Sequence, residues 1–193
     1  MVTEFNPQRE KNRLEDATDW VLSRSRSLGA RASAVAASAS IGLEVQARLG
    51  QPEKLEMTRD QSISVTAFVG ESRGTASTTD LSPEALGRTL EAAIAIARVT
   101  APDPAAVLAD ASQIIQEVPD LDLDHAWALT PEAALALAVE VESYGLQVDP
   151  RVTNSDGGAV SSSRSVSVHG TPEGLMVSQA SSLHGMSCVL LAE

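Results

Sequence analysis

Residues that would support several common functions are scarce in this sequence of 193 residues. It contains one cysteine, Cys188, so no disulfide can form within the chain, which fits a reducing compartment. Aromatic residues make up only 3%, so the core must be built from Ala, Val, Leu and Ile. Basic residues number 14 against 26 acidic ones, a net charge of −12. Because nucleic-acid binding needs clustered positive charge, this balance argues against a DNA or RNA partner.

Long hydrophobic runs are also missing. The segment from Met1 to Arg13 has no apolar stretch of the kind found in secretory signals, and the longest apolar runs fall well short of a membrane span. We therefore expect a soluble, cytoplasmic protein without a membrane partner.

The motifs of zinc hydrolysis are absent. There is no HExxH or HExxxH, and His125, His169 and His184 are far apart in sequence, with no glutamate after any of them. Such a site needs about three protein ligands and an open position. His184 and Cys188 would converge on a helix, but their flanks favour a strand, where residues four apart are about 13 Å from each other. The sequence thus predicts no catalytic, cofactor-binding or metal-binding residue within 1–193.

Other polar segments receive structural interpretations. The run Ser161–Ser165 leaves a Ser/His/Asp triad open, but no GxSxG motif exists, and a hydrogen-bonding strand face is favoured. The segment 154–158 (NSDGG) lacks the spacing of a calcium loop and predicts a turn. Gly70–Gly74 lacks the lysine of a phosphate-binding loop. Residues 103–124 contain six acids and no base, which suits a solvated connector, with a cation or basic partner as the alternative.

The segment from Glu53 to Thr100 indicates the fold most clearly. Leu55 and Met57, and then Ile63 to Val69, alternate with polar residues, which predicts two strands, each with one buried face. Gly70–Gly74 predicts a hairpin turn into a strand at residues 75–79. Ser82-Pro83-Glu84 then carries the signals of a helix start.

The remaining elements extend this pattern. Helical periodicity predicts helices at 9–28, 82–99 and 131–145, after a loose tail at 1–8. The interior of the third helix is apolar all round, which predicts cover on two sides. Strands are expected at 31–40, 43–49, 160–169 and within 175–192. The predicted fold class is α+β: a mostly antiparallel sheet with three helices layered on one face.

Several short motifs occur in an order that resembles the N-terminal region of the TldD/PmbA family, also called the modulator of DNA gyrase or microcin-processing protease family. They are EKLE at 53–56, RD at 59–60, VG at 69–70, GTASTTDLSPEAL at 74–86, DLDL at 120–123 and VDPRVTNSDG at 148–157. The PmbA (TldE) branch is the closer match. Gln61-Ser62 departs from the pattern, since the family usually has glycines there. Arg59, Asp60, Asn154 and Asp156 stand in family-like turns, and a structural role is expected for each.

The resemblance implies a function that the residues alone do not. Family members are more than twice this length, so 1–193 is expected to be an N-terminal domain whose C-terminal domain is absent. It implies a non-catalytic subunit of a cytoplasmic peptidase that acts on unfolded peptides. The expected partner is a TldD-like subunit, which would hold the zinc; a homodimer is the alternative. Two other hypotheses remain open: a self-sufficient metalloprotease with its metal site in the missing half, and a protein-binding modulator of DNA gyrase.

Overall fold

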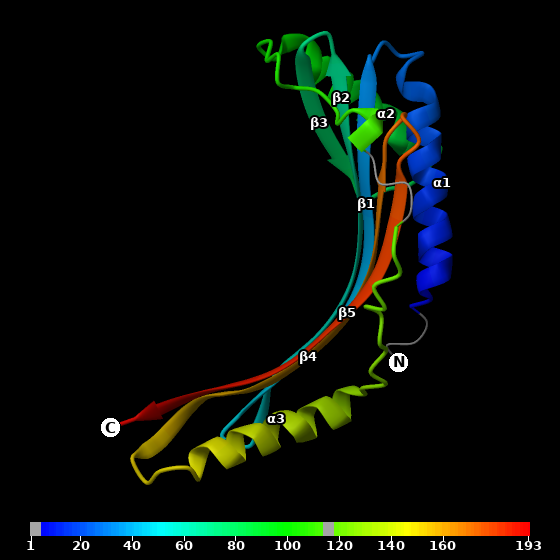
Figure 1. Ribbon diagram of the computed structural model, residues 1–193. Helices are drawn as coiled ribbons and strands as arrows, with labels where there is room; N and C mark the ends of the chain where they lie inside the picture. The colour runs from blue at the N-terminus through cyan, green and yellow to red at the C-terminus, as the bar shows by residue number, and fades with distance from the viewer. Residues whose placement is uncertain (1–4, 114–117) are drawn as a thin grey trace.

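The computed structural model describes residues 5–113 and 118–193, which form a five-stranded antiparallel sheet with three α-helices (Figure 1). The strand order is β3-β2-β1-β4-β5. In chain order the elements are α1 (Pro7–Ser25), β1 (Ala32–Arg48), β2 (Gln51–Val69), β3 (Ser72–Thr78), α2 (Pro83–Val99), a 3-10 turn η1 (Ala111–Gln113), α3 (Pro131–Leu146), β4 (Val152–Gly170) and β5 (Met176–Ala192). The predicted α+β class is confirmed.

The three helices cover one face of the sheet, as predicted. The β1 residues that pack beneath α1 and α2 include Val35 and Ala37, and those beneath α3 include Leu43 and Val45. These are alternate residues of one strand, so they share a face. Figure 1 shows that the sheet is strongly curved, with α1, α2 and α3 on its convex side.

Capping side chains set the starts of the helices. Ser82 accepts a hydrogen bond from Ala85 N, as the sequence predicted, and Thr130 accepts one from Ala133 N in the same way. The start of α1 was predicted too late. Asn6 caps this helix by accepting a hydrogen bond from Arg9 N at 3.1 Å, and Pro7 occupies the first turn. Phe5 is buried as well, so the predicted tail at 1–8 is wrong for residues 5–8; residues 1–4 lie outside the described part.

The strands are longer than predicted. β1 runs through Gly42 without a break, and β2 runs through Asp60. The two strands pair from Ala32–Phe68 to Arg48–Gln51, with one register shift between Gln46 and Ala47. Two predicted pairs of strands are therefore one hairpin, whose turn lies at Leu49-Gly50. Asp60 did not end a strand because the ladder to β1 satisfies the backbone on both sides of it.

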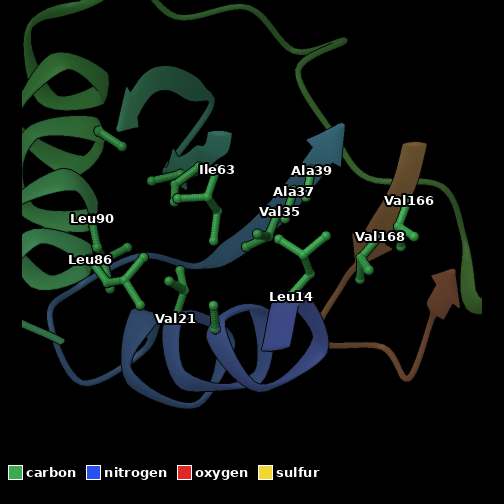
Figure 2. Close-up of a cluster of buried hydrophobic side chains, with 14 of the residues drawn as sticks. Leu14, Val21, Val35, Ala37, Ala39, Ile63, Leu86, Leu90, Val166 and Val168 are labelled. Carbon is green, nitrogen blue, oxygen red and sulfur yellow. The ribbon is translucent and has the colours of Figure 1, made fainter. Parts of the chain in front are cut away.

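Two hydrophobic clusters lie beneath the helices. The larger packs α1 and α2 on the sheet and is shown in Figure 2; it includes Leu14, Val21, Val35, Ile63, Leu86, Leu90, Val166 and Val168. The smaller packs α3 on Leu43, Val45, Ala47 and Val160. Leu55 and Met57 are 58% and 46% exposed, so their predicted burial is wrong. They lie on the edge of the sheet beyond the cover of α3.

Glycines allow two helices to approach the sheet closely. A Cβ on Gly74 of β3 would collide with the backbone of Ala93 and Ala97 in α2, and one on Gly158 of β4 would collide with Ala138 O in α3. The predicted cover of α3 on two sides is wrong within the described residues. In the apolar stretch 133–139, Ala134 and Ala138 are buried against the sheet, whereas Ala133 and Ala136 are exposed.

Candidate functional site

The histidine and the cysteine that a helix would have brought together lie on a strand, as the sequence predicted. His184 and Cys188 are four residues apart on the extended strand β5. Burial raises the pKa of the Cys188 thiol, and the nearby Glu142 carboxylate adds to the rise, so the reactive thiolate is disfavoured. Within residues 5–113 and 118–193, no group of three or more His, Cys, Asp or Glu side chains is arranged to hold a metal ion.

A serine and a histidine do come together. Ser162 Oγ lies 3.0 Å from His184 Nδ1, and His184 Nε2 lies 2.8 Å from the carbonyl oxygen of His125. A carbonyl can only accept, so a neutral His184 carries its proton on Nε2 and its Nδ1 accepts from Ser162. Sequence analysis left a triad open; the structure puts a backbone carbonyl in the position where the triad has a carboxylate.

The surroundings of this pair favour a structural role. Trp127 packs edge-on against the His184 ring, with centroids 5.5 Å apart, and Ser182 N donates to Leu123 O. Asp124 is bound by Arg164, whose hydrogen bonds hold the pKa of that carboxyl below its ordinary value. These contacts fasten the end of the acidic connector to β5 and β4. Ser162 also borders a cavity of about 590 Å³ under the start of α3.

The other polar segments occupy strands where turns were predicted. Asn154 and Asp156 lie in β4, where irregular pairing with β5 and a φ of 114° at Gly157 mark bulges. Arg59 and Asp60 lie in the middle of β2, so their predicted turn is also wrong. Gly70 has the positive φ of the predicted hairpin turn, but Gly74 belongs to β3.

A cluster that the sequence analysis missed surrounds Glu10 of α1. The Glu10 side chain is only 6% exposed, and its two oxygens are bound by Arg13 and by Arg59 of β2. Arg13 also donates to Gln61 Oε1, and Gln61 donates to the carbonyl of Thr79 at 2.7 Å. A cavity of about 420 Å³ opens beside these groups. The sequence carries one indication of this burial: Glu10 precedes Leu14 by four residues, so both lie on the buried face of the helix.

The concave face of the sheet carries hydroxyl groups. Facing pairs join across the strands, with Oγ atoms 3.1 Å apart in Ser38–Ser62 and in Ser165–Ser181. Thr66 and Thr75 pair at 2.8 Å in the same way. The sequence predicted a hydrogen-bonding strand face for Ser161–Ser165. The structure confirms this for Ser165, whose hydroxyl faces away from the helices and pairs with Ser181. This face suits contact with polar or extended chains, because hydroxyls both donate and accept.

Comparison with known proteins identifies the family. Residues 34–97 match the PmbA/TldA metallopeptidase domain 1, and residues 124–193 match the central domain of the same family. The chain belongs to the PmbA/TldD metallopeptidase family. It is 38% identical over 193 residues to the metalloprotease PmbA of Escherichia coli O157:H7 and 36% identical over 182 residues to a PmbA homologue of Haemophilus influenzae. These alignments cover 100% and 94% of the chain, but only 42% and 40% of the relatives.

Solved structures show the same fold. A candidate modulator of DNA gyrase from Bacteroides thetaiotaomicron matches with a TM-score of 0.84 and 22% identity, over 93% of this chain and 41% of that one. TldE from Thermococcus kodakarensis matches with a TM-score of 0.75 and 18% identity, over 92% and 39%.

The two family segments share one sheet. The first contains most of β1, all of β2 and β3, and most of α2, and the second contains α3, β4 and β5; β1 and β4 pair across the junction. Helix α1, with Glu10 and Arg13, precedes both matched segments. In the described part of the chain, no helix has the length and apolar character needed to cross a membrane.

Proposed function

We propose that this chain is the non-catalytic N-terminal part of a PmbA/TldE-like subunit in a cytoplasmic zinc-dependent peptidase that acts on unfolded peptides. Its role is assembly with a TldD-like partner, or with a second copy, and access of the substrate to the active site. By resemblance, microcin precursors and antitoxins are candidate substrates.

The observation that carries this proposal is the free edge of β2. β3 pairs with β2 only from Ile63 to Val69, so within the described residues the stretch from Gln51 to Ser62 has a strand partner on one side only. An extended peptide can add to such an edge through backbone hydrogen bonds that do not depend on sequence. The hydroxyl-rich concave face adjoins this edge and offers further polar contacts. Both features suit a surface that holds unfolded chains.

Zinc would be held elsewhere than in the described residues. The His, Cys, Asp and Glu side chains of the described residues form no group that could bind a metal ion. His184 contacts His125, but only its backbone carbonyl oxygen. We therefore derive no catalytic step from these residues.

A second candidate is a self-sufficient metalloprotease whose metal site lies outside residues 1–193. The names of the relatives favour it, because the proteins with 38% and 36% identity are called a metalloprotease and a metalloprotease homologue. A modulator of DNA gyrase is the weakest alternative; the chain's charge of −12 would limit that role to protein contacts.

A peptidase assay separates the two main candidates. The intact protein is incubated with an unfolded peptide, alone and mixed with a TldD-like subunit, each with and without a zinc chelator. The proposal expects cleavage only in the mixture, abolished by the chelator. Chelator-sensitive cleavage by the intact protein alone would overturn the non-catalytic role and support the self-sufficient enzyme.

A further inference from the structure

Arg13 and Arg59 line the cavity of about 420 Å³, and Glu10 holds both guanidinium groups in place. Glu10 binds Arg13 Nε at 3.0 Å through one oxygen and the Arg59 guanidinium at 3.2 Å through the other. The arginine side chains remain 39% and 63% exposed, whereas Glu10 is almost fully buried. Fixed guanidinium groups lose little conformational freedom when they bind a ligand, and their planar donors match a carboxylate.

The charge on this side of the sheet favours an anion. Two positive groups share one carboxylate, and that carboxylate already accepts hydrogen bonds from both. Asp60 also borders the cavity, but it follows Arg59 in a strand, so its side chain projects from the opposite face. The cluster is therefore locally cationic within a strongly acidic chain.

The cavity lies where the free edge of β2 ends. The β2–β3 ladder stops at the pair Ile63–Thr78, and the hydrogen bond from Gln61 to Thr79 O closes the edge just beyond it. A peptide strand that pairs with the free stretch of β2, on the Gln51 side of this hydrogen bond, cannot continue past Gln61. One terminus of such a peptide is thus brought to Arg59.

The charge decides which terminus it is. A terminal ammonium would meet two guanidinium groups, while a terminal carboxylate would find unused donors on both. We propose that Arg13 and Arg59 bind the C-terminal carboxylate of an extended peptide that lies along the free edge of β2 and parallel to it. This inference rests on the proposed peptide-handling function and adds the polarity and the end-group of the bound chain.

Binding of labelled peptides to the intact protein tests the inference. The probe is an eight-residue Thr/Val/Ser peptide with an N-terminal fluorophore, compared with the same peptide carrying a C-terminal amide and with an amidated version containing one internal glutamate. Fluorescence anisotropy is measured for the wild type, for R59Q and for R73Q. Arg73 is an exposed arginine on neighbouring β3 that projects from the concave face, which makes R73Q the matched control.

The expected result is that the free acid binds about tenfold more tightly than the amide, as for a charge-assisted hydrogen-bonded pair. R59Q should remove that difference without weakening the amide, and R73Q should preserve it. Equal binding of acid and amide would overturn the inference while leaving the peptide-handling function intact. Tight, Arg59-dependent binding of the glutamate-containing amide would assign the site to side-chain carboxylates and contradict it. If neither peptide binds, both this inference and the proposed peptide contact on this chain fail.

Unfolding by urea, measured on the same variants, detects a structural effect. If R59Q lowers stability but keeps the tenfold preference for the free acid, the arginine serves only to anchor α1 to β2, and the inference is wrong.

Discussion

Glu142 of α3 accepts hydrogen bonds from the backbone N–H groups of Leu49 and Gly50, at 2.8 and 2.9 Å. These two residues form the turn between β1 and β2, with φ angles of 50° and 72°. Glu142 is 1% exposed, so its carboxylate depends on these donors for compensation. The contact connects α3 to the hairpin at the end of the sheet that α3 covers.

Replacing Glu142 with alanine should therefore destabilise the protein by about 2–3 kcal/mol, because the turn loses two hydrogen bonds to a charged acceptor. The measurement is the free energy of unfolding in urea. Glu140→Ala is the matched control, since Glu140 is exposed on the same helix and should change stability little. Equal effects of the two changes would show that the turn does not depend on Glu142.

The same carboxylate should make stability depend on pH. Burial opposes its ionisation, but hydrogen bonds from Gly50, Ser155 and Leu49 outweigh burial and leave the pKa of Glu142 below its ordinary value. A lowered folded-state pKa contributes stability above the unfolded pKa of about 4.3, and this contribution is lost as the pH falls through the folded value. Urea unfolding at pH 7 and below pH 4 should show a larger loss for the wild type than for E142Q; an equal loss would contradict the assignment.

Glycine-to-alanine changes test the close helix contacts. G158A and G74A should each destabilise by about 1–3 kcal/mol, since the added methyl collides with helix backbone. G87A on α2 is the control, because its Cβ would lie at an ordinary 3.6 Å from Trp20. Thermal unfolding of the three variants gives the comparison, and wild-type stability for G158A would show that α3 is not seated on β4 at this point.

Thr18 offers a stabilising change. It is fully buried in α1, and its hydroxyl has no hydrogen-bond partner within the described residues. T18V keeps the shape and removes the unsatisfied oxygen, so it should stabilise the protein by about 1 kcal/mol. T89V is the comparison, because the Thr89 hydroxyl donates to Ala85 O at 2.8 Å and its loss gives no such gain. A destabilised T18V would mean that the hydroxyl has a partner.

Local patterns in the sequence predicted the helices and the fold class well. Ser82 and Thr130 mark helix starts through contacts with their immediate neighbours, so their effect is visible in sequence. The predicted end of the first helix at residue 28 is wrong, because α1 ends at Ser25. The N-cap at Asn6 follows the same rule but was overlooked. The exposure of Leu55 and Met57 could not be predicted, because it depends on how far α3 extends across the sheet.

Longer-range contacts were harder to foresee. The Glu10 cluster joins residues 49 positions apart, and the Ser162–His184 contact depends on the register of β4 with β5. Neither spacing has a sequence signature. Only the position of Glu10 on the apolar stripe of α1 hinted at a buried carboxylate that needed basic partners.

The zinc content of the intact protein, purified by itself without chelators and measured by mass spectrometry of the metals, tests the central claim most directly. Our account predicts no stoichiometric zinc in this protein and one equivalent in its complex with a TldD-like subunit. One zinc per chain in the protein alone, retained on dialysis and accompanied by peptide cleavage, would contradict the non-catalytic role.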